Sequence, residues 1–160
     1  MRFLAGALLA FFSLFARAQD SAPLFAATLT GLDDQPVALA QWRGRPLIVN
    51  FWARWCGPCR TEIPELAKLR QQYQPKGLEV LGIGIEDKTE PVRDFAKAYE
   101  MDYPVLIGKD KGLELMRALG NAKMGLPFTV AVDRQGKLVV IKMGGIKGDE
   151  LVAAAEAALK

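Results

Sequence analysis

The chain has 160 residues, of which 51% are hydrophobic and 24% are charged, and its formal net charge is +3. This length and composition are typical of one globular domain with a sizeable core, and they exclude a disordered or fibrous chain. Two of the 21 Lys and Arg residues lie in the first seventeen positions, so the rest of the chain is nearly neutral. It therefore lacks the basic surface of a nucleic-acid-binding protein.

The N-terminal segment has the pattern of an export signal. Met1-Arg2 is followed by the mostly apolar stretch Phe3–Ala16 and then by the small-x-small site Ala16-Arg17-Ala18. This pattern predicts a signal peptide over residues 1–18, cut after Ala18, and a single domain over 19–160. An uncleaved membrane anchor is the less favoured alternative, because a membrane helix needs ~20 apolar residues. Either way, we expect export to the periplasm, where disulfides are permitted.

The remaining sequence alternates between strand and helix patterns. The first two and the last two predicted strands are each separated by a short turn, so each pair is expected to form a hairpin. This order predicts an α/β fold with a central mixed sheet flanked by helices. The predicted strands are 26–30, 36–38, 46–53, 78–85, 103–107, 128–132 and 138–143; the predicted helices are the single turn 39–42, then 58–73, 90–99, 111–119 and 147–160.

The only two cysteines of the chain, Cys56 and Cys59, lie at the junction between a predicted buried strand and a predicted helix. The unpaired N–H groups and the dipole of the first helical turn favour a thiolate at Cys56, which makes it nucleophilic near neutral pH. Cys59, one turn later, is expected to face the interior and to act as the resolving thiol. The pair therefore predicts a dithiol–disulfide exchange site. Arg54 and Arg60 flank it, and their charges either favour the thiolate or, as surface charges, have no effect.

Two plainer interpretations of the cysteines are less favoured. A structural zinc site needs about four ligands, and the chain has no histidine and no third cysteine. A purely structural disulfide that closes so short a loop removes little entropy from the unfolded chain. We therefore expect no metal and no cofactor other than the redox-active disulfide.

Three segments carry a family resemblance: Val49-Asn50-Phe51-Trp52-Ala53-Arg54-Trp55-Cys56-Gly57-Pro58-Cys59, Gly125-Leu126-Pro127-Phe128-Thr129, and Asp133-Arg134-Gln135-Gly136. With them the sequence resembles the thioredoxin superfamily and, within it, the exported TlpA/ResA-like branch of thiol:disulfide oxidoreductases. The resemblance implies a thioredoxin-like fold over about residues 24–159. It also implies the N-terminal hairpin and the Pro91–Ile107 insertion of that branch.

The resemblance also implies a client-binding surface. Pro127 is expected to have a cis peptide bond and to pack beside the disulfide, with an ordinary trans proline as the alternative. The backbone of Leu126 would then pair with an extended client segment. Trp55 is expected on the surface beside the disulfide, and Gly57 and Pro58 complete the predicted substrate-binding set.

A carboxylate is expected to handle protons near the cysteines. The resemblance points to Glu86, at the end of a predicted strand, as a residue that exchanges a proton with Cys59. Asp87 is an alternative, and a solvated loop carboxylate with no catalytic part is another. Cytosolic thioredoxins carry a buried aspartate where this chain has Asn50, which cannot titrate, and this difference increases the interest of Glu86.

The dipeptide Gly57-Pro58 is the one found in reducing thioredoxins, so we expect a reductant of client disulfides. We also expect the protein to be a monomer. The resemblance implies that a membrane thiol reductase of the DsbD/CcdA kind recharges it. The family's common client is apocytochrome c. Phe128, however, stands where dedicated cytochrome-maturation members have an acidic residue, which favours a general reductant.

Two other functions stay open at this point. A thioredoxin-fold thiol peroxidase would need Thr or Ser three residues before its reactive cysteine, where this chain has Ala53. A non-catalytic module that holds client chains against Leu126 and Pro127 would not need the intact cysteine pair.

Overall fold

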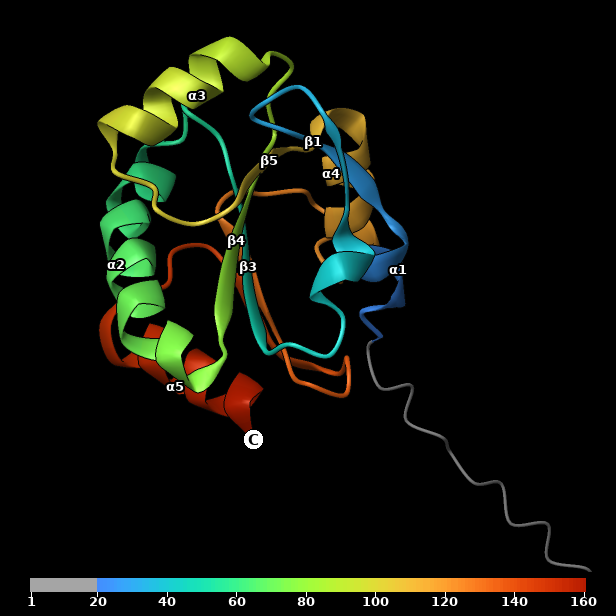
Figure 1. Ribbon diagram of the computed structural model, residues 1–160, viewed down its shortest axis with the longest axis vertical. Coiled ribbons are helices and arrows are strands. Elements are labelled where there is room, and N and C mark those ends of the chain that lie inside the picture. The colour runs from blue at the N-terminus through green and yellow to red at the C-terminus, as the bar shows by residue number, and fades with distance from the viewer. Residues whose placement is uncertain (1–19) are drawn as a thin grey trace, which may run out of the picture.

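The computed structural model describes residues 20–160, so the predicted signal peptide and its cleavage site lie outside the described residues. The described part forms one mixed sheet with the strand order β2-β1-β5-β4-β3-β6-β7 and with helices on both faces (Figure 1). This arrangement confirms the predicted α/β fold with a central mixed sheet. The strands are β1 (Thr28–Gly31), β2 (Pro36–Ala38), β3 (Leu47–Trp52), β4 (Glu79–Gly84), β5 (Val105–Ile107), β6 (Phe128–Val132) and β7 (Leu138–Met143).

The middle strand, β3, is buried over its whole length. It pairs in parallel with β4, with Trp52 opposite Gly84, and antiparallel with β6, with Phe51 opposite Phe128. Parallel neighbours end at the same edge of a sheet, whereas an antiparallel neighbour begins there. The carboxyl ends of β3 and β4 and the start of β6 therefore meet at one edge.

Helices cover both faces of the sheet and bury two apolar clusters. In Figure 1, α2, α3 and α5 lie on one side of the sheet, and α1 and α4 lie on the other. Side chains alternate along β3, so Ile48 and Trp52 enter the cluster with α2, while Val49 and Phe51 enter the opposite one. The helices are α1 (Ala22–Ala26), α2 (Gly57–Tyr73), α3 (Thr89–Ala98), α4 (Lys109–Ala118) and α5 (Gly148–Leu159), with 3-10 turns η1 (Leu39–Trp42) and η2 (Gln74–Lys76).

The main departure from the sequence prediction is at the start of the domain. Ala26 was predicted to begin a strand, but it ends the helix α1, and the first strand begins at Thr28. Pro23 lies in the first turn of α1, where its missing N–H is harmless, and Leu24 and Phe25 are buried. Burial of these two side chains in the apolar cluster that also includes residues of η1 and α4 stabilises a turn of helix that local propensity alone does not predict.

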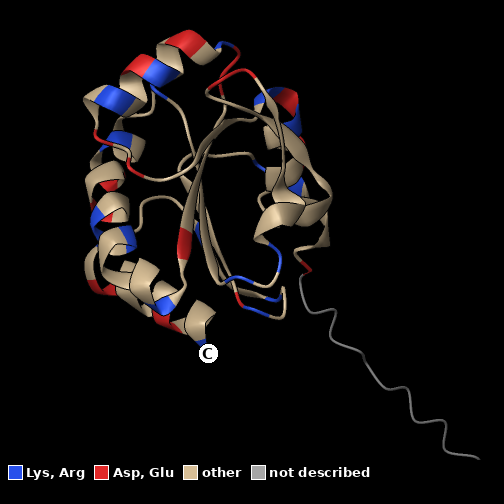
Figure 2. Cartoon of the chain, viewed as in Figure 1, with Lys and Arg blue, Asp and Glu red and all other residues tan. Residues whose placement is uncertain are grey.

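Charged residues lie mainly on the helices and loops, and the strands are largely uncharged (Figure 2). This distribution is expected for a sheet that is covered by helices on both faces. Within residues 20–160, no helix combines the length and the apolar character that crossing a membrane requires.

Gly82 of β4 leaves room for the side chains of Tyr103 and Trp52 to lie directly on the sheet. A Cβ added at Gly82 would lie 3.0 Å from Tyr103 Cε2 and 3.1 Å from Trp52 Nε1, whereas the contacts of one added at Gly84 begin at 3.6 Å. We expect Gly82→Ala to lower the free energy of unfolding by about 1–3 kcal/mol, the usual cost of overpacking. The matched Gly84→Ala is expected to change it by less than about 1 kcal/mol. Urea unfolding of the oxidised proteins measures both values, and equal losses would contradict this packing argument.

Candidate active site

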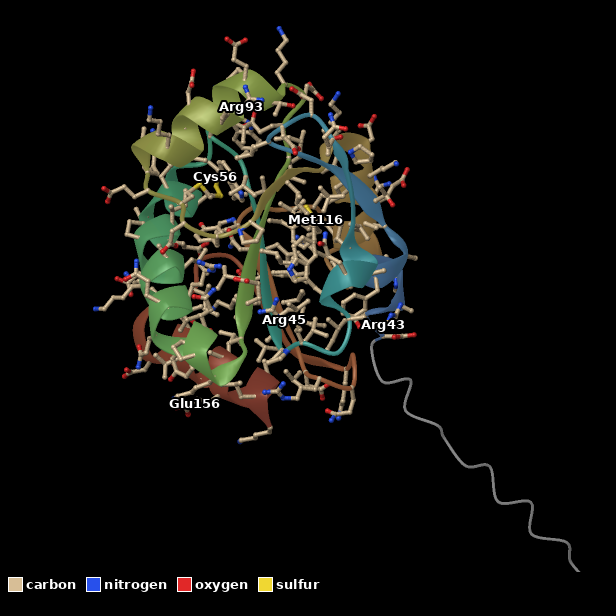
Figure 3. All side chains as sticks on the ribbon, viewed as in Figure 1. Arg43, Arg45, Cys56, Arg93, Met116 and Glu156 are labelled. Atoms are coloured by element: carbon tan, nitrogen blue, oxygen red, sulfur yellow. A yellow bond between two sulfur atoms is a disulfide. The ribbon has the colours of Figure 1, made fainter. Side chains whose placement is uncertain are left out.

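The two cysteines form a disulfide at the start of α2, just below α3 in the view of Figure 3. Cys56 is the N-cap residue of α2, and Cys59 lies in the first turn, with 5.3 Å between their Cα atoms. The backbone N–H of Cys59 donates to Cys56 Sγ at 3.3 Å. In the reduced protein this N–H and the helix dipole would stabilise a thiolate on Cys56, as the sequence predicts.

The two sulfur-bearing residues differ in exposure. Cys56 is 6% exposed and lies beside Trp55, which is 72% exposed, whereas Cys59 is completely buried. Trp52, by contrast, is buried and stacks on Phe95 of α3 with 5.2 Å between ring centroids. The Cys56 end of the disulfide therefore lies nearer the surface than the Cys59 end.

Pro127 lies next to this site because β6 begins beside the end of β3. The Leu126–Pro127 peptide bond is cis, as predicted. Pro127 directly precedes Phe128, which pairs with Phe51, and its carbonyl accepts the N–H of Gly144 at 2.9 Å. Pro127 is buried and Leu126 is half-buried, so the segment reaches the surface just before the proline.

Glu86, the predicted proton-handling carboxylate, is bound to Arg54. Its Oε1 accepts the backbone N–H of Arg54 at 2.7 Å, and its Oε2 accepts the guanidinium of the same residue at 3.2 Å. The neighbouring Asp87 is exposed. The structure therefore places Glu86 against the residues that lead into Cys56, with both carboxylate oxygens already engaged.

A second carboxylate, Glu62, lies on the buried face of α2, and the sequence analysis missed it. It follows Cys59 by three residues, so both side chains lie on the same face of the helix. Its Oε1 accepts the backbone N–H of Ile146 at 2.5 Å, and its Oε2 accepts Nδ2 of Asn50 at 3.1 Å. Asn50 Nδ2 also donates to Thr129 Oγ1 at 3.0 Å. These contacts link Glu62 of α2, Asn50 of β3 and Thr129 of β6 in a buried chain of hydrogen bonds.

Burial decides the protonation behaviour of Glu62, which is only 2% exposed. Desolvation raises its pKa above the ordinary value, although the hydrogen bonds from Ile146 and Asn50 and the charge of Lys142 oppose the rise. A raised pKa makes the ionised carboxylate of Glu62 a stronger proton acceptor than an ordinary solvated carboxylate. Glu62 is thus placed to exchange a proton on the Cys59 side of the disulfide.

The site can therefore carry out thiol–disulfide exchange with protein groups alone. Cys56 lies at a helix N-terminus beside exposed Trp55, completely buried Cys59 lies in the first turn, and the buried carboxyl group of Glu62 lies on the same helix face. Among residues 20–160, no cluster of three or more His, Cys, Asp or Glu side chains is arranged to hold a metal ion.

The chain is similar to known thiol–disulfide oxidoreductases. It is 32% identical over 132 residues to the thiol-disulfide oxidoreductase ResA of Bacillus thuringiensis subsp. konkukian, covering 82% of this chain and 72% of that one. It is 34% identical over 127 residues to the thioredoxin-like protein YneN of Bacillus subtilis, covering 78% and 71%. A crystal structure of a putative thiol:disulfide interchange protein DsbE from Chlorobium tepidum matches with a TM-score of 0.72 and 29% identity, over 84% of this chain and 93% of that one.

The family model described as Redoxin matches residues 17–159, which is nearly the whole chain. The site geometry agrees with these similarities, because the cysteine pair forms a disulfide at the start of α2. The names of ResA and of the DsbE structure both state thiol–disulfide chemistry, and the chain is a protein-disulfide oxidoreductase. It therefore belongs to the Redoxin family and, within the thioredoxin superfamily, to the ResA-like thiol:disulfide oxidoreductases.

Proposed function

We propose that this oxidoreductase is exported to the periplasm and reduces disulfides in client proteins. The position of Cys56 at the N-terminus of α2, beside exposed Trp55, carries the proposal, because it assigns Cys56 to the client and completely buried Cys59 to resolution. The direction rests on Gly57-Pro58, the dipeptide of reducing thioredoxins. Export rests on the signal pattern of residues 1–18.

The reaction follows from these positions. The Cys56 thiolate attacks one sulfur of the client disulfide; the other client sulfur leaves as a thiolate and takes up a proton. Cys59 then loses its proton and attacks Cys56, which forms the Cys56–Cys59 disulfide and releases the second client sulfur. Two electrons pass from the dithiol to the client. A membrane thiol reductase of the DsbD/CcdA kind is proposed to return the protein to its reduced form.

Proton transfer in the second step is assigned to Glu62. Cys59 is completely buried, so water does not readily take its proton. Glu62 lies three residues along the same helix face, and burial raises its pKa. Glu86 was the residue predicted for this part, but its carboxylate is ion-paired with the guanidinium of Arg54, whereas Glu62 accepts only from a backbone N–H and an amide N–H. These contacts favour Glu62 as the acceptor of the Cys59 proton, and a different role for Glu86 is proposed below.

The client is proposed to bind across the exposed surface around Cys56. Trp55 offers an exposed aromatic face, Gly57 and Pro58 border the disulfide, and the backbone at Leu126 is available to pair with an extended segment. Such a segment is short, so a monomer suffices to bind it. Apocytochrome c fits as one client among several, since Phe128 stands where dedicated members carry an acidic residue.

Replacement of the resolving thiol is expected to trap clients. In Cys59→Ser the first attack still occurs, but the mixed disulfide on Cys56 cannot be resolved. Periplasmic extracts or membranes should therefore yield adducts that dithiothreitol releases and that mass spectrometry identifies. The matched control, Cys56→Ser, is expected to yield none, because its remaining thiol is completely buried. Equal adducts from both variants would contradict the assigned roles.

The reduction potential tests the direction of electron flow. Equilibration of the purified protein with dithiothreitol buffers is expected to give a midpoint nearer the ~−270 mV of thioredoxin than the ~−120 mV of DsbA. A midpoint above about −180 mV, the value of protein disulfide isomerase, would make the protein an oxidant or an isomerase instead.

Removal of the Glu62 carboxylate is expected to slow the resolving step. A proton acceptor contributes at least tenfold to such a step, so Glu62→Gln should slow release of a trapped model peptide by about tenfold or more at pH 7. In the wild type the rate should rise with pH through the raised pKa of Glu62, because the ionised form accepts the proton; the variant should lose this rise.

The control for this measurement is Glu65→Gln, one turn farther along α2, which should resolve the adduct at the wild-type rate. Alkylation of Cys56 should also stay within about twofold in Glu62→Gln, because the first attack does not use this group. A normal resolving rate in Glu62→Gln together with a slow rate in Glu86→Gln would contradict this assignment and identify Glu86 as the proton acceptor.

A further inference from the structure

Glu86 makes a two-point contact with Arg54, which lies two residues before the nucleophile Cys56 in the sequence. The carboxylate of Glu86 contacts both the backbone N–H of Arg54 at 2.7 Å and its guanidinium at 3.2 Å. The side chain of Glu86 is only 8% exposed, whereas that of Arg54 is 40% exposed. The contact therefore fixes a nearly buried anion against a backbone position two residues before Cys56.

The strand register explains why these two residues meet. Trp52 lies opposite Gly84 at the ends of the parallel strands β3 and β4, and the N–H of Ile85 donates to the carbonyl of Trp52 at 2.8 Å. Two residues beyond each strand end, Arg54 and Glu86 are thus side by side. The chain then turns into α2, with the N–H of Cys56 bonded to the carbonyl of Ala53 at 3.1 Å.

The ion pair changes the electrostatic environment of Cys56. An unpaired arginine two residues from the nucleophile would favour the thiolate, which is one of the two possibilities that the sequence leaves open. Glu86 brings an opposite charge to the same guanidinium, so the two charges largely cancel. The other charged residues of these segments, Arg60, Asp87 and Lys88, are exposed, and solvent screens them more strongly.

We propose that Glu86 is a positioning residue that controls the reactivity of Cys56 through Arg54. One oxygen holds the backbone that leads into the nucleophile, and the other cancels the arginine charge, which keeps the thiolate fraction of Cys56 low enough for a reducing protein. A more stable thiolate would stabilise the reduced form and make the protein a poorer reductant. This inference rests on the proposed role of Cys56 as the nucleophile.

A double-mutant cycle tests the charge balance. Glu86→Gln keeps an oxygen for the Arg54 N–H but leaves the arginine charge uncompensated, so the thiolate fraction of Cys56 at pH 7 should rise about threefold, the size expected of one partly screened unit charge. Arg54→Met leaves the glutamate charge and should lower the fraction by a similar factor. The double variant should return to within about twofold of the wild type. Thiolate absorbance and the iodoacetamide alkylation rate of the reduced proteins measure these fractions.

The potential provides the second readout, and it should become less negative in Glu86→Gln, more negative in Arg54→Met and near the wild-type value in the double variant. Asp87→Asn is the matched control, because it removes an exposed charge from the same loop and should change neither readout. Shifts in the same direction for both single variants, or no restoration in the double variant, would overturn the proposal.

A purely structural role would appear as a loss of free energy of unfolding with unchanged thiolate fractions, and this outcome also overturns it. The titration uses the reduced protein without a client. A failure of the predicted thiolate shifts is therefore distinct from a failure of Cys59→Ser to trap clients. Only the second result would contradict the proposed function itself.

Discussion

The arrangement of the site depends on the pairing of β3 with one parallel and one antiparallel neighbour. The parallel strand β4 ends where β3 ends, and the antiparallel strand β6 begins there. Three segments that are distant in sequence therefore meet at one edge of the sheet: the loop into α2 with Cys56, the loop after β4 with Glu86, and Pro127. The register of the buried strands fixes the relative positions of these segments, so their proximity does not depend on the conformations of long loops.

A buried carboxyl group is the most costly element of the site, and the surrounding structure is built to tolerate it. Glu62 accepts a backbone N–H from Ile146 and a side-chain N–H from Asn50, and Asn50 is itself anchored to Thr129. Buried polar groups of this kind are costly unless they are hydrogen-bonded. Asn50 therefore has a physical role although it cannot titrate, because it orients the group that can. The carboxyl group thus lies on helix α2, and strand β3 contributes the amide that hydrogen-bonds to it.

The sequence predicted those parts of the fold that local patterns encode. The strands Phe128–Val132 and Leu138–Met143 were predicted with their observed bounds, because the run of buried residues and the turn between them are local features. Glu62 was missed because an acidic residue in an amphipathic helix resembles a solvent-facing one; its three-residue spacing from Cys59 was the available signal. The contact between Glu86 and Arg54 was beyond prediction, since it depends on the register of two parallel strands, which no local pattern fixes.

The two cysteines lie only three residues apart, yet different groups act on them. Cys56 responds to the outer side of the site: the N-terminus of α2, through the N–H of Cys59, and the Arg54–Glu86 pair. Cys59 faces the interior and shares its helix face with Glu62, whose pKa is raised by the same burial that shields the sulfur. Because the strength of the attacking thiolate and the ease of resolution depend on separate groups, each can change without the other. A reducing protein needs this separation, since a nucleophile made too stable as a thiolate loses reducing power, whereas faster deprotonation of the buried thiol speeds release without that loss.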